Sequence, residues 1–378
     1  MSVWDDVVGQ ETAVAALQGA SRDPAAMTHA WLITGPPGSG RSIAARAFAA
    51  ALQCAVGGCG HCQACTTTMA GTHADVTIVA TEKVTISIEE VRDLIGLAQR
   101  SPSQGRWRVV IVEDADRMVE RTSNVLLKAI EEPPPRTVWV LCAPSPQDVV
   151  TTIRSRCRGV VLRVPPVADV AALLVARDGV DPGVADTAAR AAQSHVGQAR
   201  RLARDPEARE RRARGLQLAA SIRGVGDAVM AAADMVEVAA ADAKSATADR
   251  DADERAALLR TLGAQEGQQL PPSLRAQVRQ LEDDQKRRAT RAQRDVLDRT
   301  LVDLLSMYRD VLVVQLGADV DLVNVAEEAE VRRLAAVSTP EQSVRRMDAI
   351  GVARERLAGN VAPLLAMEAM AVALRPQG

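Results

Sequence analysis

The sequence predicts an α/β core built on a parallel sheet, followed by a small helical unit and an all-helical C-terminal region. Short β-like apolar runs alternate with helical stretches up to about residue 165, which is typical of a parallel sheet covered by helices. The five runs are residues 31–34, 76–79, 109–112, 138–142 and 160–164. All four tryptophans lie in the first 140 residues, so the chain changes character along its length.

These patterns divide the chain into three predicted parts, residues 1–165, 166–215 and 216–378. In the third part, apolar residues recur at helical spacing over residues 294–316 and 347–374, and such stripes are first of all core. Residues 242–255 contain small and charged side chains with little to bury, which predicts a surface insertion or a mobile loop.

Composition narrows the class of function. The chain has 378 residues, a net charge of −2 and only six aromatic residues, so it offers neither a general attraction to nucleic acid nor many rings for base stacking. Strong direct DNA binding is therefore not expected. The first residues lack a basic region and an apolar segment, and no apolar run approaches transmembrane length, which predicts a soluble cytoplasmic protein without membrane contact.

A glycine-rich phosphate-binding loop follows the first apolar run and opens an alanine-rich helical segment. Its residues are Gly35, Pro36, Pro37, Gly38, Ser39, Gly40, Arg41 and Ser42. In such a loop, backbone N–H groups surround the phosphates of ATP or ADP and the final hydroxyl, here Ser42, binds Mg²⁺. Arg41 replaces the usual lysine, and a planar guanidinium is a poor substitute for a point charge. The sequence predicts impaired nucleotide binding and weak or absent hydrolysis. A turn without a ligand is the alternative.

An acidic pair, Glu113 and Asp114, ends the third apolar run, where nucleotide hydrolases hold magnesium and polarise water. The usual order is aspartate and then glutamate. With the order reversed, the side chain on the metal side is longer by one methylene group and the side chain on the water side is shorter by one. A misplacement near 1 Å costs about 10²-fold in rate, which also predicts a poor ATPase. The alternative is that these acids, with Asp116, cap the next helix.

Four of the six cysteines form a C-x4-C-x2-C-x2-C array, which consists of Cys54, Cys59, Cys62 and Cys65. Four thiolates fill a tetrahedral shell, so the array predicts a structural Zn²⁺ site. Disulfides are the competing interpretation, disfavoured by crowded spacing and a cytoplasmic setting, and free thiols are another. His61 or His73 is an alternative ligand in place of Cys54.

A compact basic element at residues 151–158 contains Arg154, Arg156 and Arg158. Composition alone favours a solvated or ion-paired surface for such a cluster.

Taken together, four motifs resemble the delta-prime type of clamp-loader subunit of bacterial DNA polymerase III, within the AAA+ family. They are GPPGSGRS at residues 35–42, the four-cysteine knuckle, SNVLLKAIEEPP at residues 123–134 and SRC at residues 155–157. The opening WDDVVGQ at residues 4–10 and GQAR at residues 197–200 also resemble the family, so the resemblance spans essentially the whole chain.

The resemblance implies an AAA+ core, a helical lid and a C-terminal collar that joins a hetero-pentamer with gamma or tau and delta subunits. The sliding clamp and primed DNA would be reached through this complex, a component of the DNA polymerase III holoenzyme, a DNA-directed DNA polymerase. Arg200 falls on the lid arginine that senses nucleotide. Arg156 falls on the arginine finger, which acts in trans on the ATP of a neighbouring subunit.

Departures from the motor-subunit pattern fall on this chain's own ATP site. They are Arg41, the reversed order of Glu113 and Asp114, and Ala143-Pro144 where motor subunits carry hydroxyl residues. A subunit that keeps the arginine finger but has lost residues of its own ATP site fits a stator, a rigid subunit against which the ATP-driven subunits move. Two alternatives stay open, an active gamma- or tau-like ATPase motor and a zinc-stabilised scaffold without a nucleotide role.

Overall fold

The computed structural model describes residues 2–23, 25–81, 85–261 and 271–376 of the chain. It contains two compact units, residues 1–204 and residues 205–378, which are described separately. The division of the chain into parts at residues 165 and 215 stays a prediction. Among the described residues, no helix is long and apolar enough to cross a membrane.

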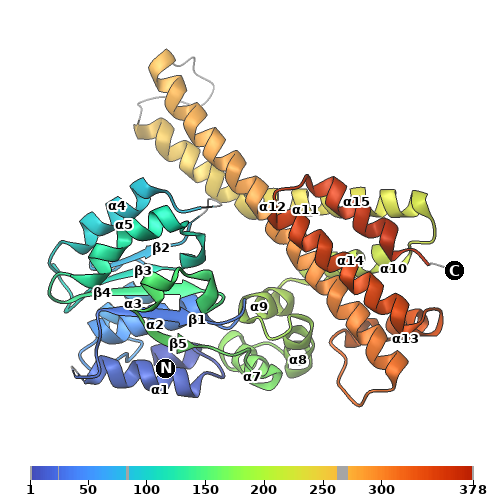
Figure 1. Ribbon diagram of the computed structural model, residues 1–378, viewed down its shortest axis with the longest axis horizontal. Helices are drawn as coiled ribbons and strands as arrows, with labels where there is room; N and C mark the ends of the chain where they lie inside the picture. The colour runs from blue at the N-terminus through green and yellow to red at the C-terminus, as the bar shows by residue number, and fades with distance from the viewer. Residues whose placement is uncertain (1, 24, 82–84, 262–270, 377–378) are drawn as a thin grey trace. The chain divides into compact units, whose positions relative to one another are not determined.

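The first unit is built on a five-stranded parallel sheet in the order β2-β3-β4-β1-β5 (Figure 1). Its strands are β1 (Ala30–Thr34), β2 (Val76–Val79), β3 (Arg108–Val112), β4 (Thr137–Ala143) and β5 (Arg158–Val161). All five predicted strands are therefore confirmed. The last strand ends earlier than predicted, because the Gln10 side chain hydrogen-bonds both backbone groups of Arg163. The Gln10 Oε1 atom accepts from the Arg163 N–H at 3.0 Å, and the Gln10 Nε2 atom donates to the Arg163 carbonyl at 2.6 Å.

Helices cover both faces of this sheet. They are α1 (Glu11–Arg22), α2 (Arg41–Gln53), α3 (Gln63–Met69), α4 (Ile88–Ala98), α5 (Glu120–Glu131) and α6 (Thr151–Arg154), with 3-10 turns at Val3–Asp6, Ala115–Arg117 and Pro146–Asp148. Helices α7 (Val167–Asp178), α8 (Pro182–Ala191) and α9 (Val196–Arg204) complete the unit.

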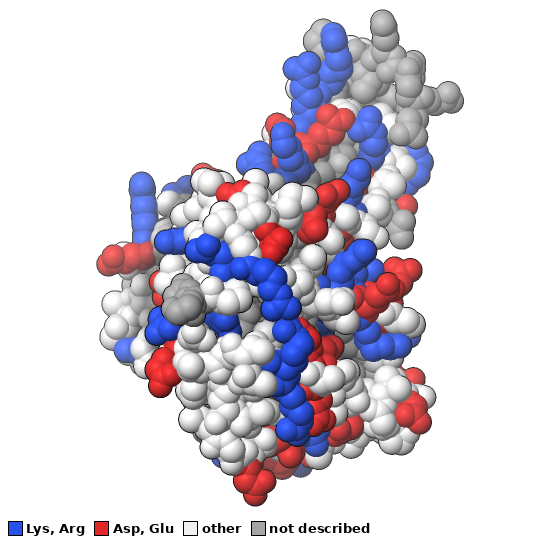
Figure 2. All heavy atoms as spheres, turned by 90° about the vertical axis from the view of Figure 1, so that its right-hand side faces the viewer, with Lys and Arg blue, Asp and Glu red and all other residues white. Residues whose placement is uncertain are grey.

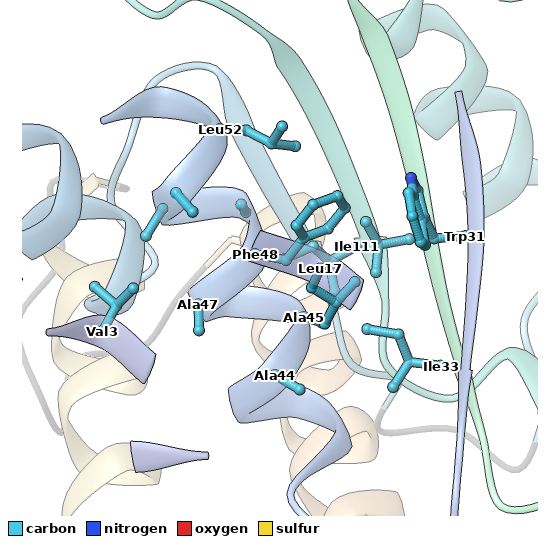
Figure 3. Packing of buried hydrophobic residues seen from close by; sticks show 14 of the residues in the cluster. Val3, Leu17, Trp31, Ile33, Ala44, Ala45, Ala47, Phe48, Leu52 and Ile111 are labelled. Atoms are coloured by element: carbon cyan, nitrogen blue, oxygen red, sulfur yellow. The ribbon is translucent and has the colours of Figure 1, made fainter. Parts of the chain in front are cut away.

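Alternate residues of each strand pack into two separate hydrophobic cores, one on each face of the sheet. On one face, Trp31, Ile33 and Ile111 pack against α1 and the alanine-rich α2, as Figure 3 shows. The Trp31 and Phe48 rings meet edge to face with centroids 5.1 Å apart. Strand neighbours such as Leu32 and Val110 point to the opposite face, where α4 and α5 pack. Burial on both faces explains why the strands are continuous apolar runs.

The second unit is helical throughout its described residues, as predicted. It comprises α10 (Pro206–Ala220), α11 (Val225–Thr261), α12 (Pro272–Leu316), α13 (Glu328–Ala336), α14 (Pro340–Ala358) and α15 (Pro363–Leu374), with a 3-10 turn at Val325–Glu327. The predicted stripe is core, since Leu297, Leu301, Leu304 and Tyr308 on α12 are all buried.

The predicted loop at residues 242–255 is wrong, because these residues lie within helix α11. Their partner is helix α12, whose Arg288 binds Asp251 at 3.1 Å and Glu254 at 2.9 Å. Ion pairs between the alanine-rich α11 and the charged α12 therefore replace the apolar burial that the sequence lacks there. Residues 262–270, part of the same uncertain stretch, lie outside the described residues.

Candidate functional site

The glycine-rich loop connects the carboxyl end of β1 to the first turn of α2, as predicted. Gly38 and Gly40 have φ of 85° and 90°, a region that favours glycine, so the chain turns sharply before the helix begins at Arg41. Ser42 lies half-buried in that first turn, and Pro36 and Pro37 are exposed. The loop therefore has the strand, turn and helix order that a phosphate site requires.

The Arg41 side chain is used inside the loop. Its Nη1 donates a hydrogen bond to the carbonyl oxygen of Gly35, so the guanidinium folds back over the loop that it follows. The loop N–H groups are partly used as well, since Ser39 N–H donates to the Pro36 carbonyl at 3.1 Å. The buried Ser39 hydroxyl has no hydrogen-bond partner among the described residues. The cation expected to reach a phosphate is thus committed to the backbone.

A histidine that the sequence analysis missed packs against the loop. A Cβ atom placed on Gly38 would lie 2.7 Å from the Cα, Cβ and Cγ atoms of His195, which directly precedes α9. Position 38 therefore admits only glycine while His195 stays in place. The one available signal was position, since His195 stands two residues before the GQAR segment.

Arg200, the predicted nucleotide sensor on α9, binds a carboxylate within the helical part of the first unit. Its Nε and Nη2 atoms lie 2.7 and 2.5 Å from the two carboxylate oxygens of Asp178, at the end of α7. This hydrogen-bonded carboxylate also raises the pKa of the Arg200 guanidinium. Arg200 would have to leave Asp178 before it could contact a phosphate.

The acidic pair is also occupied. Glu113, immediately after β3, accepts hydrogen bonds from Arg46 on α2, with Oε1 2.9 Å from Nη2 and 3.1 Å from Nε. Asp114 accepts the Thr81 N–H at 3.1 Å and lies 3.7 Å from the Nε atom of Arg117. It stands at the N-cap of the next 3-10 turn without a capping hydrogen bond from its side chain.

Asp116 shows that the loop and the acidic segment share one electrostatic environment. Burial and the charge of Asp114 raise the pKa of the Asp116 carboxyl, and the Arg41 guanidinium opposes this shift. The sequence singled out Arg41 and Glu113, but it gave no signal for Arg46, which is 67 positions from its partner.

The four predicted cysteines converge. Their sulfur atoms all lie within 4.8 Å of one another, and no other His, Cys, Asp or Glu of the described residues joins this group. Cys54 ends helix α2 and Cys62 precedes α3, with their Sγ atoms 3.8 Å apart. A tetrahedral site with Zn–S bonds of about 2.3 Å needs sulfurs roughly 3.8 Å apart, so these residues fit zinc.

Two of the alternatives for the cluster, disulfides and a histidine ligand, are less well supported, and free thiols stay an alternative. No disulfide joins the four cysteines. His61 and His73 contact their own backbone, with Nδ1 atoms 3.0 Å from the Cys59 carbonyl oxygen and 3.1 Å from the Asp75 nitrogen respectively.

Thiol acidity within the cluster is uneven. Burial tends to raise the pKa of Cys54, but backbone N–H groups of Cys59, Gly58 and Val56 outweigh it and lower that pKa to about 6. Burial raises the pKa of Cys65. Backbone N–H groups of His61 and Cys62 lower the pKa of Cys59 as well, so the fold favours the metal-binding thiolate form at both Cys54 and Cys59.

The three arginines of the basic element have different surroundings. Arg154 donates to the Pro146 carbonyl at 3.2 Å, and Arg158 donates to the Ala26 carbonyl at 2.7 Å and lies 5.0 Å from the centroid of the Trp31 ring. Arg156, in the turn between α6 and β5, donates to the Thr152 carbonyl at 2.8 Å and also pairs with the Glu131 carboxylate at 2.5 Å. The Arg156 and Glu131 side chains are 39% and 42% exposed, so this pair faces solvent.

The parallel sheet and the GPPGSGRS loop after β1 define the class of protein, an α/β fold of the P-loop type. A family model described as "DNA polymerase III, delta subunit" matches residues 9–166. The predicted resemblance to the clamp-loader subunits of DNA polymerase III is thereby confirmed for this part of the chain. Beyond residue 166 it stays a prediction.

Curated relatives of two kinds match. The chain is 39% identical over 135 residues to DNA polymerase III subunit delta' of Pseudomonas aeruginosa, covering 34% of this chain and 41% of that protein. It is 34% identical over 174 residues to the gamma/tau subunit of Mycobacterium tuberculosis, covering 45% of this chain and 30% of that protein. The chain thus spans less than half the length of either relative.

Among solved structures, a RuvB mutant of Thermotoga maritima matches with a TM-score of 0.40 and 16% identity, over 57% of this chain and 66% of that one.

Proposed function

We propose that the chain is the delta-prime, or stator, subunit of the DNA polymerase III clamp loader. In this role it joins gamma or tau and delta subunits in a hetero-pentamer that loads the sliding clamp on primed DNA. Support comes from the family match over residues 9–166 and from relatives named as delta' and gamma/tau subunits.

The choice of stator over motor depends on one observation, the internal pairing of charges at the chain's own phosphate loop. Arg41 donates to the Gly35 carbonyl and Glu113 binds Arg46, so neither side chain is free for a phosphate or a magnesium ion. An active gamma- or tau-like motor would need both groups. ATP or ADP with Mg²⁺ at residues 35–42, with Arg200 as a contact, is therefore proposed only as weak or structural binding.

Arg156 supplies the catalytic contribution in this proposal. It lies in an exposed turn, and its carboxylate partner Glu131 is equally exposed, so the pair can be exchanged for another anion at small cost. An arginine presented to a neighbouring ATP neutralises charge at the transferring phosphoryl group, which is worth roughly 10³–10⁵ in rate. All three arginines donate to backbone carbonyls, Arg156 to that of Thr152 at 2.8 Å. Among the described residues, Arg156 is the one of the three that also pairs with a carboxylate.

A reconstituted clamp loader tests this role. The complex contains one active motor subunit, placed next to this chain, and motor subunits with inactive loops elsewhere. We expect Arg156→Ala to lower ATP turnover about 10³-fold, whereas Arg154→Ala, a matched change two residues away, changes it less than about twofold. Glu131→Gln should retain turnover, because Glu131 binds the finger only in the free chain.

Light scattering on each complex separates failed assembly from failed catalysis. An assembled Arg156→Ala complex with unchanged turnover would contradict the finger and favour the zinc-stabilised scaffold.

We also propose that Cys54, Cys59, Cys62 and Cys65 hold a structural zinc ion. The cluster ends α2, the helix that starts in the phosphate loop, so the metal would fix the far end of that helix. Metal analysis of the isolated protein should give one zinc per chain, and Cys62→Ser should lose it and lower the melting temperature by several degrees. Cys142→Ser, a change at a buried cysteine outside the cluster, should retain the metal. Equal metal content in both variants would contradict the site.

A further inference from the structure

The second unit buries an arginine without an anionic partner. Arg346 on α14 is 6% exposed, and its buried Nη1 has no hydrogen-bond partner among the described residues. The guanidinium lies over the ring of Tyr308, 5.6 Å from the centroid. A ring face offsets only part of the cost of removing a charge from water, and buried charges are normally paired. Within the described part of the chain, Arg346 therefore has no counter-ion.

Two small cavities flank this guanidinium. One, of about 20 Å³, is bordered by Arg223, Tyr308 and Arg346 together with apolar side chains that include Leu334 and Val337. The other, of about 10 Å³, is bordered by Gln342, Arg345, Arg346 and Arg375. Of the residues that the structure describes, none with a carboxylate borders either cavity.

The nearby acids do not supply the missing charge. Glu330 pairs with Arg333 at 2.5 Å, and Glu341 is an exposed residue in the first turn of α14. Figure 2 shows Lys and Arg side chains gathered on one face, with Asp and Glu side chains beside them. At the two cavities themselves, the charged neighbours of Arg346 are Arg223, Arg345 and Arg375, so its immediate surroundings are positive.

We propose that Arg346 and Arg223 form a recognition pocket for an acidic side chain of a partner protein. A cavity of about 20 Å³ holds a group of only one or a few atoms, so it admits the tip of a side chain and excludes a whole nucleotide. Apolar walls suit the methylene stem of a glutamate, and a guanidinium binds its carboxylate with two donors. Val337, which borders this cavity, is 64% exposed and offers the partner one apolar contact beside the pocket.

The chain offers a specific probe, because Tyr308 is its only tyrosine and lies beneath Arg346. Fluorotyrosine labelling gives one fluorine resonance at the pocket. We expect this resonance to shift saturably on titration with acetyl-glutamate amide and not with acetyl-glutamine amide at equal ionic strength. Inorganic phosphate serves as the competing anion.

Arg346→Gln should weaken the glutamate response at least tenfold, and Arg223→Gln, at an exposed position, should weaken it severalfold. Arg356→Gln on the same helix lies outside both cavities and should change nothing. In the free chain, Arg346→Gln should leave the melting temperature unchanged or raise it, because it removes an unpaired buried charge.

Three results would overturn the proposal. They are a saturable response to phosphate but not to glutamate, no saturable response to either, and a strongly destabilised Arg346→Gln variant, which would mean that the charge is already satisfied inside the fold.

Discussion

The arginines near the phosphate loop and Arg156 in the basic element at residues 151–158 differ in how exposed their partners are. Arg41 and Arg46, at the loop, are consumed by the Gly35 carbonyl and by Glu113, whose side chain is only 13% exposed. Arg156 pairs with a carboxylate that is 42% exposed. The ion pair at the loop is therefore partly shielded by the fold, whereas the ion pair of Arg156, which also donates to the Thr152 carbonyl at 2.8 Å, faces solvent.

A third ion pair, more deeply buried than the other two, extends this comparison of exposure. Asp75 and Arg108 are almost completely buried and lie 2.9 Å apart. Exposure thus increases from Asp75–Arg108 through Arg46–Glu113 to Arg156–Glu131, and the stability that depends on each pair should fall in the same order.

The largest expected effect is at Asp75. Its carboxylate accepts backbone N–H groups of Ser103, Gln104 and Gly105 at 2.6–2.8 Å in addition to the Arg108 contact. Asp75→Asn places an amide donor against these donors and leaves a buried cation unpaired, so we expect a loss of about 3–5 kcal/mol of unfolding free energy. Urea denaturation measures it, and a loss below 1 kcal/mol would break the proposed order.

Acid should reproduce part of that effect. Burial tends to raise the pKa of Asp75, but the hydrogen bonds from Gly105, Ser103 and Gln104 outweigh it and lower that pKa to about 2, below its usual 3.8. A lowered folded pKa stabilises the protein above pH 4, and this stabilisation is lost as the pH falls from about 4 to 2. We expect a contribution of about 2 kcal/mol at 1.36 kcal/mol per pKa unit. It should be missing from the acid titration of Asp75→Asn.

A smaller effect is expected for Gly38→Ala. An alanine there must adopt a φ of 85° and would place its Cβ atom 2.7 Å from His195, so either the loop or the start of α9 must move. The left-handed conformation alone costs about 1–2 kcal/mol. Gly96→Ala on α4 has free space around it and should be neutral or slightly stabilising by thermal denaturation. Equal stability of the two variants would mean that His195 does not constrain the loop.

The smallest effect is expected for Arg46→Ala. The pair with Glu113 is partly exposed, so its loss should cost no more than about 1 kcal/mol. The change releases Glu113 but leaves Arg41 bound to Gly35, and ATP turnover should stay absent. Turnover gained by this single change would show that Glu113 pairing, and not Arg41, inactivates the loop.

The sequence predicted features that are local in the chain. Apolar runs, glycines and cysteine spacing depend on a few neighbouring residues, so the five strands, the Gly38 and Gly40 turn and the cysteine cluster could be predicted. Helix α11 could not be predicted over residues 242–255, because ion pairs with Arg288 replace apolar burial there.

Long-range pairs were also missed. Arg46 with Glu113 and His195 with Gly38 join residues 67 and 157 positions apart, and no local pattern marks them. The first contact occupies the Glu113 carboxylate and the second restricts position 38 to glycine, and neither effect could be predicted from the motif alone.

ATP turnover by the purified, folded and metal-loaded chain alone tests the central claim most directly. With Arg41 and Glu113 both paired inside the fold, turnover should not exceed that of buffer. A rate near or above about 1 s⁻¹, within the usual range for working enzymes, would contradict the stator and identify an active motor.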